Sequence, residues 1–367
     1  MNILLIICLL LLGLILVLAE KTGKAPLAWI PFAIFYCFVI ATRSILTPDT
    51  IAYVNYYNSL NVNSVNFENS KFEIGFQLLT TLIKAITTSD YLFYFYLLAL
   101  LNVVVIVLSI RNLYIICANE GKRIGVISYV FPLLLYISYF GILYNGIVLR
   151  AGLAISFVIY ASTICYLNIS TFSKVIKVFF FLAIACSFHR TSIIALLVFF
   201  VFLFTKEYSQ RKYLCILLII IFVYISNVGD SVTPFFIDVD LLTSFSEYRA
   251  LDGISKINSY LVREGVNSGF SLKYSFFMLL GGFYICKPFA TKIFYKYLNV
   301  FLCGMFIYAV FHKVDYLGRG LDFFLIYSFI LSFLSLKTIK TNFFGYTVYV
   351  FILICQIILV MRIVNKI

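Results

Sequence analysis

The chain has 367 residues, of which 63% are hydrophobic and 12% are charged, and its 28 Lys and Arg against 15 Asp and Glu give a net charge of +13. Soluble domains are about 45–50% apolar and about 25% charged, whereas a membrane-crossing helix needs roughly 17–25 apolar residues. The composition therefore excludes soluble, disordered and disulfide-scaffold proteins and predicts an all-α, polytopic membrane protein.

Twelve apolar segments are predicted to cross the membrane as helices. In chain order they cover residues 3–19, 26–42, 91–110, 124–140, 147–167, 173–187, 190–205, 213–228, 271–286, 297–311, 321–336 and 344–361. The first segment lacks a positively charged region before it, so we interpret it as a retained helix rather than a cleaved signal peptide. No internal repeat or linker interrupts the chain, which predicts a single transmembrane domain over residues 1–367.

The placement of the basic residues predicts the orientation. Alternate loops carry 15 Lys and Arg beside only three Glu, namely Lys21, Lys24, Arg111, Lys122, Arg123, Lys174, Lys177, Lys206, Arg211, Lys212, Lys287, Lys292, Lys296, Lys337 and Lys340 beside Glu20, Glu120 and Glu207. Short loops rich in Lys and Arg stay cytoplasmic. We therefore expect both termini outside, and we interpret the positive charge as a topology signal rather than a surface for nucleic acid.

Segment 73–88 is moderately apolar but contains Glu73, Gln77 and Lys84. A full crossing here would invert every later loop and place the Lys-rich loops outside. We therefore predict an amphipathic helix at the external face.

Two predicted external loops, 43–72 and 229–270, are expected to face a substrate. In the second loop Arg249, Lys256 and Arg263 recur every seven residues and would form one stripe on a helix. The stripe fits either a solvated amphipathic helix or an electropositive surface for phosphate or an acidic sugar. The same loop contains Asp238-Val239-Asp240, which matches the Asp-x-Asp pattern of some metal sites. A match of three residues is more typical of a solvated loop than of a metal site.

Cysteine and histidine usage argues against a bound metal or cofactor. Eight of the nine cysteines fall inside apolar runs, no Cys-x-x-Cys is present, and the chain has only two histidines. We expect the cysteines to fill space between helices as small apolar side chains. We predict no metal site and no cofactor.

Charged residues at the external ends of the predicted spans are the strongest functional signal, because charge in a membrane is expensive and is functional by default. Arg150 opens an otherwise apolar span, His189 and Arg190 interrupt a long apolar run, and Arg319 opens another span. The alternatives are snorkelling of Arg150 to the interface, a packing role for His189, and pairing of Arg319 with Asp315.

Arg43, Asp49 and Glu73 fall on the same predicted face. Arginine forks match phosphate oxygens with two bonds, and carboxylates can deprotonate a sugar hydroxyl. The sequence therefore predicts a site for a lipid-linked diphosphate and for glycosyl transfer. The diphosphate would bind Arg43, Arg150, Arg190 and Arg319, and Asp49, Glu73 and His189 are the candidate catalytic residues.

The order of these residues resembles the EpsG/Wzy-like family of polysaccharide polymerases over residues 43 to 325. The matching residues are Arg43, Asp49-Thr50, Tyr53, Phe72-Glu73-Ile74-Gly75-Phe76, Asn145, Arg150, Ala154, His189 and Arg319. The resemblance implies a glycosyltransferase of the bacterial inner membrane, similar in fold to lipid-dependent GT-C enzymes. Such an enzyme joins undecaprenyl-diphosphate-linked repeats into O-antigen or capsule. Sugar or loop contacts are expected at Tyr53, Asn145, Arg249 and Arg263.

Other classes of protein fit part of this pattern. A flippase or other transporter of lipid-linked sugars suits twelve spans, although transporters tend to show paired repeats and charges at mid-membrane. An O-antigen ligase would use the same donor, and a non-catalytic scaffold would leave the external arginines unexplained. The expected partners are lipid-linked oligosaccharides and membrane lipids, with a chain-length regulator as a candidate and no nucleic acid.

Overall fold

The computed structural model describes residues 3–21, 27–47, 49–62, 72–87, 90–122, 124, 128–228, 271–311, 320–339 and 342–364. Within these ranges the regular secondary structure is helical and no strand occurs. All nine cysteines are free in the structure. The chain forms two compact units, residues 1–196 with 339–367 and residues 197–338.

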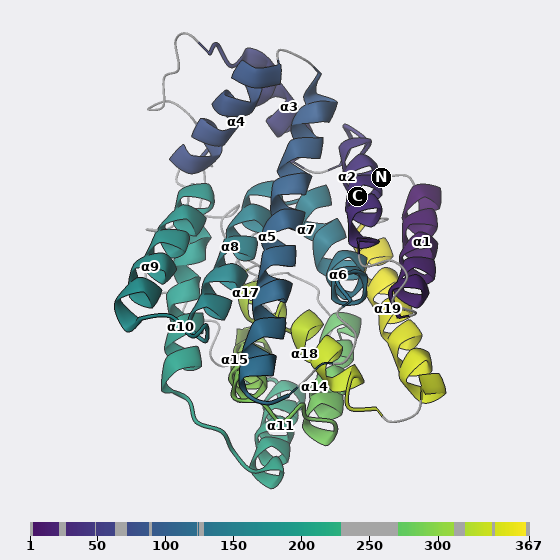
Figure 1. Ribbon diagram of the computed structural model, residues 1–367, viewed down its shortest axis with the longest axis vertical. Coiled ribbons are helices and arrows are strands. Elements are labelled where there is room, and N and C mark those ends of the chain that lie inside the picture. Colours follow the sequence, from purple (N-terminus) through teal and green to yellow (C-terminus); the bar gives the residue numbers. More distant parts are fainter. Residues whose placement is uncertain are drawn as a thin grey trace. The chain divides into compact units, whose positions relative to one another are not determined.

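The first unit is built around the long helix α5 (Tyr91–Asn119), which packs against α2 (Trp29–Ala41) and α8 (Leu149–Ile164). α9 (Thr171–Phe188) packs on α8, and α1 (Ile3–Lys21) packs on α2 and α6 (Val130–Tyr136). α6 continues through a π-helical turn, Ile137–Gly141, into α7 (Ile142–Gly146). α19 (Asn342–Val364) packs against that turn (Figure 1).

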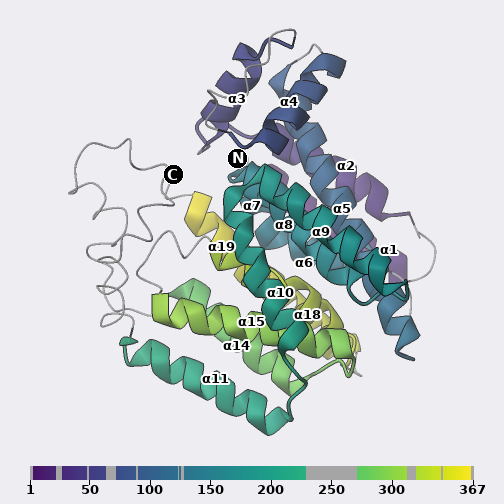
Figure 2. The same ribbon diagram turned by 90° about the vertical axis from the view of Figure 1, so that its left-hand side faces the viewer.

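Two shorter helices, α3 (Thr50–Ser59) and α4 (Ile74–Thr87), lie beside the beginning of α5 (Figure 1, Figure 2). Tyr57 stacks on Tyr94 of α5, and its hydroxyl is 3.2 Å from Thr87 Oγ1 of α4. α4 also packs on α9. The predicted segment 73–88 is therefore helical, and its position at the membrane interface stays a prediction.

The second unit contains α11 (Gln210–Ile225), α14 (Leu272–Cys286), α15 (Lys292–Phe311), α17 (Asp322–Leu325) and α18 (Ser328–Leu336). α10 (Ala195–Phe204) begins in the first unit and continues in the second. Side-chain hydrogen bonds connect its apolar helices. The Asn299 amide donates to Thr205 Oγ1 at 2.9 Å, and the Tyr284 hydroxyl donates to the Ser328 carbonyl at 2.9 Å.

Helix lengths support a membrane protein. In the described part, Ile3–Glu20, Tyr91–Asn119, Thr171–Phe188, Lys292–Phe311 and Phe343–Arg362 are long and apolar enough to cross a membrane, and shorter apolar helices accompany them. Each of the twelve predicted segments contains a helix. The number that cross the membrane and the likeness to GT-C enzymes stay predictions.

Several predicted boundaries differ from the structure. α15, for example, begins at Lys292 and not at residue 297, so Lys292 and Lys296 lie in a helix, and the largest difference is at the end of the third span. The predicted third span ends at residue 110, whereas α5 continues to Asn119. The last turns stay helical because they pack against other helices. The Asn112 amide donates to Thr163 Oγ1 at 2.9 Å, and Cys117 is fully buried. Arg111 therefore lies inside a helix and not in a loop.

Glu20 has a structural role that the loop assignment did not predict. Its carboxylate is buried at the end of α1 and accepts hydrogen bonds from the Ser128 hydroxyl and from the backbone N–H groups of Tyr129 (3.2 Å) and Val130 (3.0 Å). These N–H groups lie at the first turn of α6, where intrahelical acceptors are missing. A carboxylate there satisfies them and interacts favourably with the helix dipole.

Replacing Glu20 with Ala is expected to destabilise the first unit by about 1–3 kcal/mol, because buried donors lose their acceptor. Thermal unfolding of the purified protein in detergent measures this. Glu207, an exposed acid in another predicted inner loop, is the matched control and should tolerate Ala. Equal melting temperatures for the two variants would contradict the capping role.

Candidate active site

Glu73 lies where the ends of three helices meet. It directly precedes α4, while α9 ends at Phe188 and α8 begins at Leu149, one residue before Arg150. His189 follows α9 in an extended conformation (φ −156°, ψ 118°) and Arg190 begins a short 3-10 helix, Arg190–Ile194. Side chains from separate parts of the chain therefore meet at one end of the first unit.

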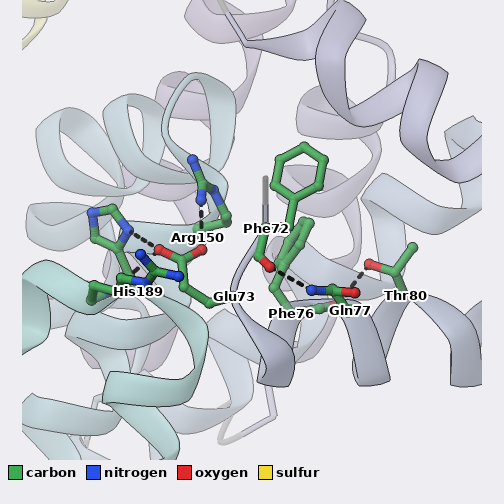
Figure 3. A network of polar contacts seen from close by, with 8 residues as sticks. Phe72, Glu73, Phe76, Gln77, Thr80, Arg150 and His189 are labelled. Atoms are coloured by element: carbon green, nitrogen blue, oxygen red, sulfur yellow. Dashed lines mark hydrogen bonds and ion pairs between the residues drawn. The ribbon is translucent and has the colours of Figure 1, made fainter. Parts of the chain in front are cut away.

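The Glu73 carboxylate binds three groups at once (Figure 3). Arg150 Nη1 donates to Oε2 at 2.5 Å. The other oxygen, Oε1, is 3.2 Å from His189 Nδ1 and accepts a hydrogen bond from the Arg190 backbone N–H at 3.2 Å. The carboxylate is 8% exposed, and the side chains of Arg150 and His189 are each 20% exposed. The buried acid therefore has partners, and the basic groups stay partly accessible.

These contacts keep Glu73 ionised. Burial alone would raise the pKa of its carboxyl group, but the hydrogen bond with His189 and the positive charge of Arg150 outweigh burial and lower the pKa to about 2. A lowered pKa means that the carboxylate stabilises the folded state above pH 4.5, and that this contribution is lost as the pH falls through about 2. Near neutral pH Glu73 is a weak proton acceptor.

His189 is better arranged for proton transfer. A carboxylate beside Nδ1 favours the tautomer that carries a proton on this nitrogen, which leaves the lone pair of Nε2 to accept another proton. In the described part of the chain Nε2 makes no hydrogen bond. The arrangement can therefore act as a general base that is oriented by Glu73.

Tyr53 lies on α3 beside this cluster. Its ring packs on Phe72 and Phe76, with centroids 5.7 and 5.5 Å away, and its side chain is 1% exposed. The charges of Arg150, Asp49 and Arg43 all act on its hydroxyl. Asp49 itself is exposed, with a left-handed backbone (φ 60°), and in the described residues it has no ion pair with Arg150.

Arg43 and Asn145 belong to an adjoining buried network. Arg43, which is 4% exposed, donates to the Asn145 carbonyl at 2.5 Å and lies 3.7 Å from the centre of the Phe95 ring. The Asn145 amide donates to the Tyr36 hydroxyl (2.7 Å) and to Asn102 Oδ1 (3.0 Å). Burial lowers the pKa of Arg43 to about 10, so it remains charged at neutral pH. The amide nitrogen of Asn145 is therefore occupied by hydrogen bonds within the protein. The expected sugar contact of Asn145 stays a prediction.

The remaining predicted residues either do not bind Glu73 through their side chains or lie outside the described residues. The side chain of Arg190 is exposed, and only its backbone contacts Glu73. Arg319, Arg249, Arg263 and the pair Asp238 and Asp240 lie outside the described residues. Within the described ranges no group of three His, Cys, Asp or Glu side chains could hold a metal ion.

Gly75 has a role that the sequence did not reveal, although it falls in the quoted motif. A Cβ at this position would lie 2.8 Å from the Ser187 backbone oxygen and would also overlap the Ser187 hydroxyl. A backbone oxygen cannot rotate away as a flexible side chain can. Gly75 therefore permits the close approach of α4 and α9 that brings Glu73 to His189.

Replacing Gly75 with Ala is expected to reduce any activity that depends on the Glu73 cluster about 100-fold, because displacement by about 1 Å is enough to disrupt a catalytic arrangement. The activity, normalised to the amount of protein in the membrane, measures this. Gly282→Ala is the control, since its Cβ would meet only Leu217, 3.9 Å away. Equal activities of the two variants would contradict the role of Gly75.

The second unit contains an ion pair that the sequence analysis did not predict. Lys273 Nζ of α14 lies 2.8 Å from Asp322 Oδ1 at the start of α17. Asp322 is 9% exposed in its side chain. The sequence could have indicated this ion pair, because Asp322 is the single acid in the apolar run 321–336 and such a residue needs a partner.

The structure is a bundle of apolar helices, and their ends bring together a carboxylate, an arginine and a histidine. This arrangement defines a polytopic membrane protein with an enzyme-like charged centre. The chain belongs to the EpsG family, whose model matches residues 26–366. EpsG is a Wzy-like family of polysaccharide polymerases, which confirms the resemblance found in the sequence. The searches of curated proteins and of solved structures gave no match. Membership supports a membrane-bound, glycosyltransferase-like polymerase in broad terms.

Proposed function

We propose that the protein joins undecaprenyl-diphosphate-linked oligosaccharide repeats into O-antigen or capsular polysaccharide at the outer face of the bacterial inner membrane. The observation that carries this proposal is the cluster in which Glu73 binds both Arg150 and His189. It combines a phosphate-binding cation with an oriented base, the two groups that glycosyl transfer from a lipid diphosphate needs.

In the proposed reaction the growing glycan on undecaprenyl diphosphate is the donor, and a sugar hydroxyl of a fresh lipid-linked repeat is the acceptor. His189 Nε2 takes the hydroxyl proton, and the oxygen forms a bond to the donor anomeric carbon. The bond from this carbon to the diphosphate oxygen breaks, and the diphosphate leaves with the electron pair. Asp49 stays a second candidate base, whereas the low pKa of Glu73 favours an orienting role.

The departing diphosphate gains negative charge in the transition state, and fixed cations stabilise such charge. Arg150 lies close to the proposed base, because both bind Glu73. Arg190 follows His189 with an exposed side chain that can reach the same substrate. Arg43 and Arg319 are the further proposed cations, and Arg249 and Arg263 are proposed to contact sugar from the second loop.

The proposed orientation rests on the Lys-rich loops. We expect reporters in residues 43–72, 229–270 and 312–320 to read outside and a reporter at Lys292 to read inside. A periplasmic signal at Lys292 would contradict the topology, since the side assigned to every later loop depends on the same number of membrane crossings.

A glycan gel from a deletion strain tests the function. Loss of the ladder with a single repeat still attached to the core indicates the polymerase. Polymer that is not attached to the core would indicate an O-antigen ligase, and loss of all surface repeats would indicate a flippase or other transporter. The last two outcomes would overturn the proposal.

A further inference from the structure

Among the described residues, several buried polar groups around the first turn of α3 find no hydrogen-bond partner at normal geometry. They are Arg43 Nε and Nη2, Thr50 Oγ1, Tyr53 Oη and Arg150 Nε, and the side chains of Tyr53 and Arg150 lie close enough to interact with each other. Thr50 and Tyr53 are each 1% exposed, and Arg43 is 4% exposed. Buried polar groups in folded proteins are nearly always paired, so several unpaired ones in one place require an explanation.

The helix geometry places the two hydroxyl groups on the same side. Thr50 and Tyr53 are three residues apart, and residues at this spacing share a helix face. They lie on the buried face of α3, whereas Ile51, Ala52 and Asn55 are exposed. The unpaired hydroxyls therefore point into the protein and not into the surroundings.

Aromatic contacts bring the arginines to this face. The Phe72 ring packs against Tyr53, and the Arg150 guanidinium lies 5.0 Å from the centre of the same ring. Arg43, fixed on Phe95, acts electrostatically on the Tyr53 hydroxyl. Two guanidinium groups therefore flank the hydroxyl of Tyr53.

The chemistry of these groups specifies one kind of ligand. The guanidinium nitrogens can only donate, and hydroxyl groups can rotate to donate. Burial raises the pKa of Tyr53, so its hydroxyl remains protonated and can donate a hydrogen bond. Donors from several directions together with two positive charges match an oxyanion, and arginine forks fit phosphate in particular.

We infer that Arg43, Thr50, Tyr53 and Arg150 form a phosphoryl-binding subsite, in which the hydroxyl groups of Thr50 and Tyr53 donate to phosphate oxygens. The assignment of this phosphoryl group to the lipid-linked diphosphate rests on the proposed function. Arg150 then connects the two parts of the site, since its Nη1 binds Glu73 and its guanidinium interacts with the Tyr53 hydroxyl. Arg150 is thereby assigned both to phosphate binding and to holding the carboxylate that orients the base.

The test removes single hydroxyl groups and measures binding of inorganic pyrophosphate to the purified full chain. Thr50→Val and Tyr53→Phe keep the side-chain shape. An unpaired buried hydroxyl weakens the folded state, so the ligand-free melting temperature of Thr50→Val should stay unchanged or rise. The dissociation constant for pyrophosphate should increase about 10- to 150-fold, as expected for a lost hydrogen bond to a charged group.

Tyr57→Phe is the matched control on the same helix. The Tyr57 hydroxyl is buried like that of Tyr53 but pairs with Thr87 Oγ1. Its loss should lower the melting temperature and leave pyrophosphate binding unchanged. The inference is overturned if Tyr53→Phe behaves in this same way, or if the wild-type protein does not bind millimolar pyrophosphate.

Two further measurements separate the source of the phosphoryl group from the function. Undecaprenyl diphosphate in nanodiscs should displace pyrophosphate, whereas a site for free phosphate would retain it, and that result would overturn the lipid assignment. Weaker pyrophosphate binding by Tyr53→Phe with a normal ladder in cells would support the subsite but contradict its use in polymer synthesis. Unchanged binding in both hydroxyl variants would contradict the subsite whatever the glycan shows.

Discussion

Replacing His189 with Ala is expected to abolish laddered glycan while the protein remains in the membrane. A positioned general base contributes about 10²- to 10⁴-fold to a rate, and His189 is the proposed base. The structure makes the reason specific, because Nδ1 faces the Glu73 carboxylate and leaves Nε2 for the acceptor hydroxyl. The ladder in a complemented deletion strain, normalised to tagged protein, measures the effect.

His189→Asn distinguishes the base from a packing residue. The Asn amide can still donate to Glu73 but offers no basic nitrogen near neutral pH. If His189 is the base, the Asn variant should be as inactive as the Ala variant. Restoration of the ladder by Asn would show that only the hydrogen bond to Glu73 matters, and Asp49 would then become the leading proton acceptor.

Replacing Arg150 with Ala has the second large expected effect. Loss of a charge-assisted hydrogen bond costs about 1.5–3 kcal/mol. If the bond to the diphosphate forms only in the transition state, the rate should fall about 10- to 150-fold. Lys should restore activity only in part, because an ammonium group cannot make the planar two-bond contact. If Arg150 only snorkels to the interface, Arg150→Lys should leave the ladder unchanged.

The ion pair with Glu73 requires a second variant. Removing Arg150 leaves a buried carboxylate without its cation, which by itself destabilises a protein by about 3–5 kcal/mol. In the double variant Arg150→Ala with Glu73→Gln, the amount of folded protein should recover while the ladder stays absent. Recovery of the ladder as well would show that Arg150 only neutralises Glu73.

Arg362 is the matched control for the arginine series. It lies in the last turn of α19 with an exposed side chain, and among the described residues it makes no ion pair. Arg362→Ala should therefore give a normal ladder. Normal ladders from Ala variants of Arg150, Arg190 and Arg319 alike would overturn the proposed diphosphate site and favour a transporter.

The sequence by itself determined the class of protein and the positions of the helices. Apolar runs must become helices in a membrane, because only internal hydrogen bonding satisfies their backbone groups. Arg150, His189 and Glu73 were recognisable because charge beside an apolar run is expensive, and this property can be seen one segment at a time. The order of the motifs was sufficient to indicate the family.

Only the tertiary structure decided which charges meet. Glu73 contacts Arg150 and His189, which lie 77 and 116 residues away in the chain. Hydropathy describes one segment and contains no information about which helix ends converge. For the same reason the sequence could not distinguish Arg43, which donates to backbone carbonyl groups, from Arg150, which pairs with an acid.

The structure also assigned roles to residues that carry no chemical signal. Gly75 matters because Ser187 approaches its backbone, and Glu20 matters because α6 begins beside it. Thr50 gave no signal in the sequence, and only the structure shows that its hydroxyl is buried without a partner among the described residues. Steric fit and hydrogen-bond satisfaction are properties of groups brought together in space, so local sequence patterns can locate the helices of this protein but cannot assemble its site.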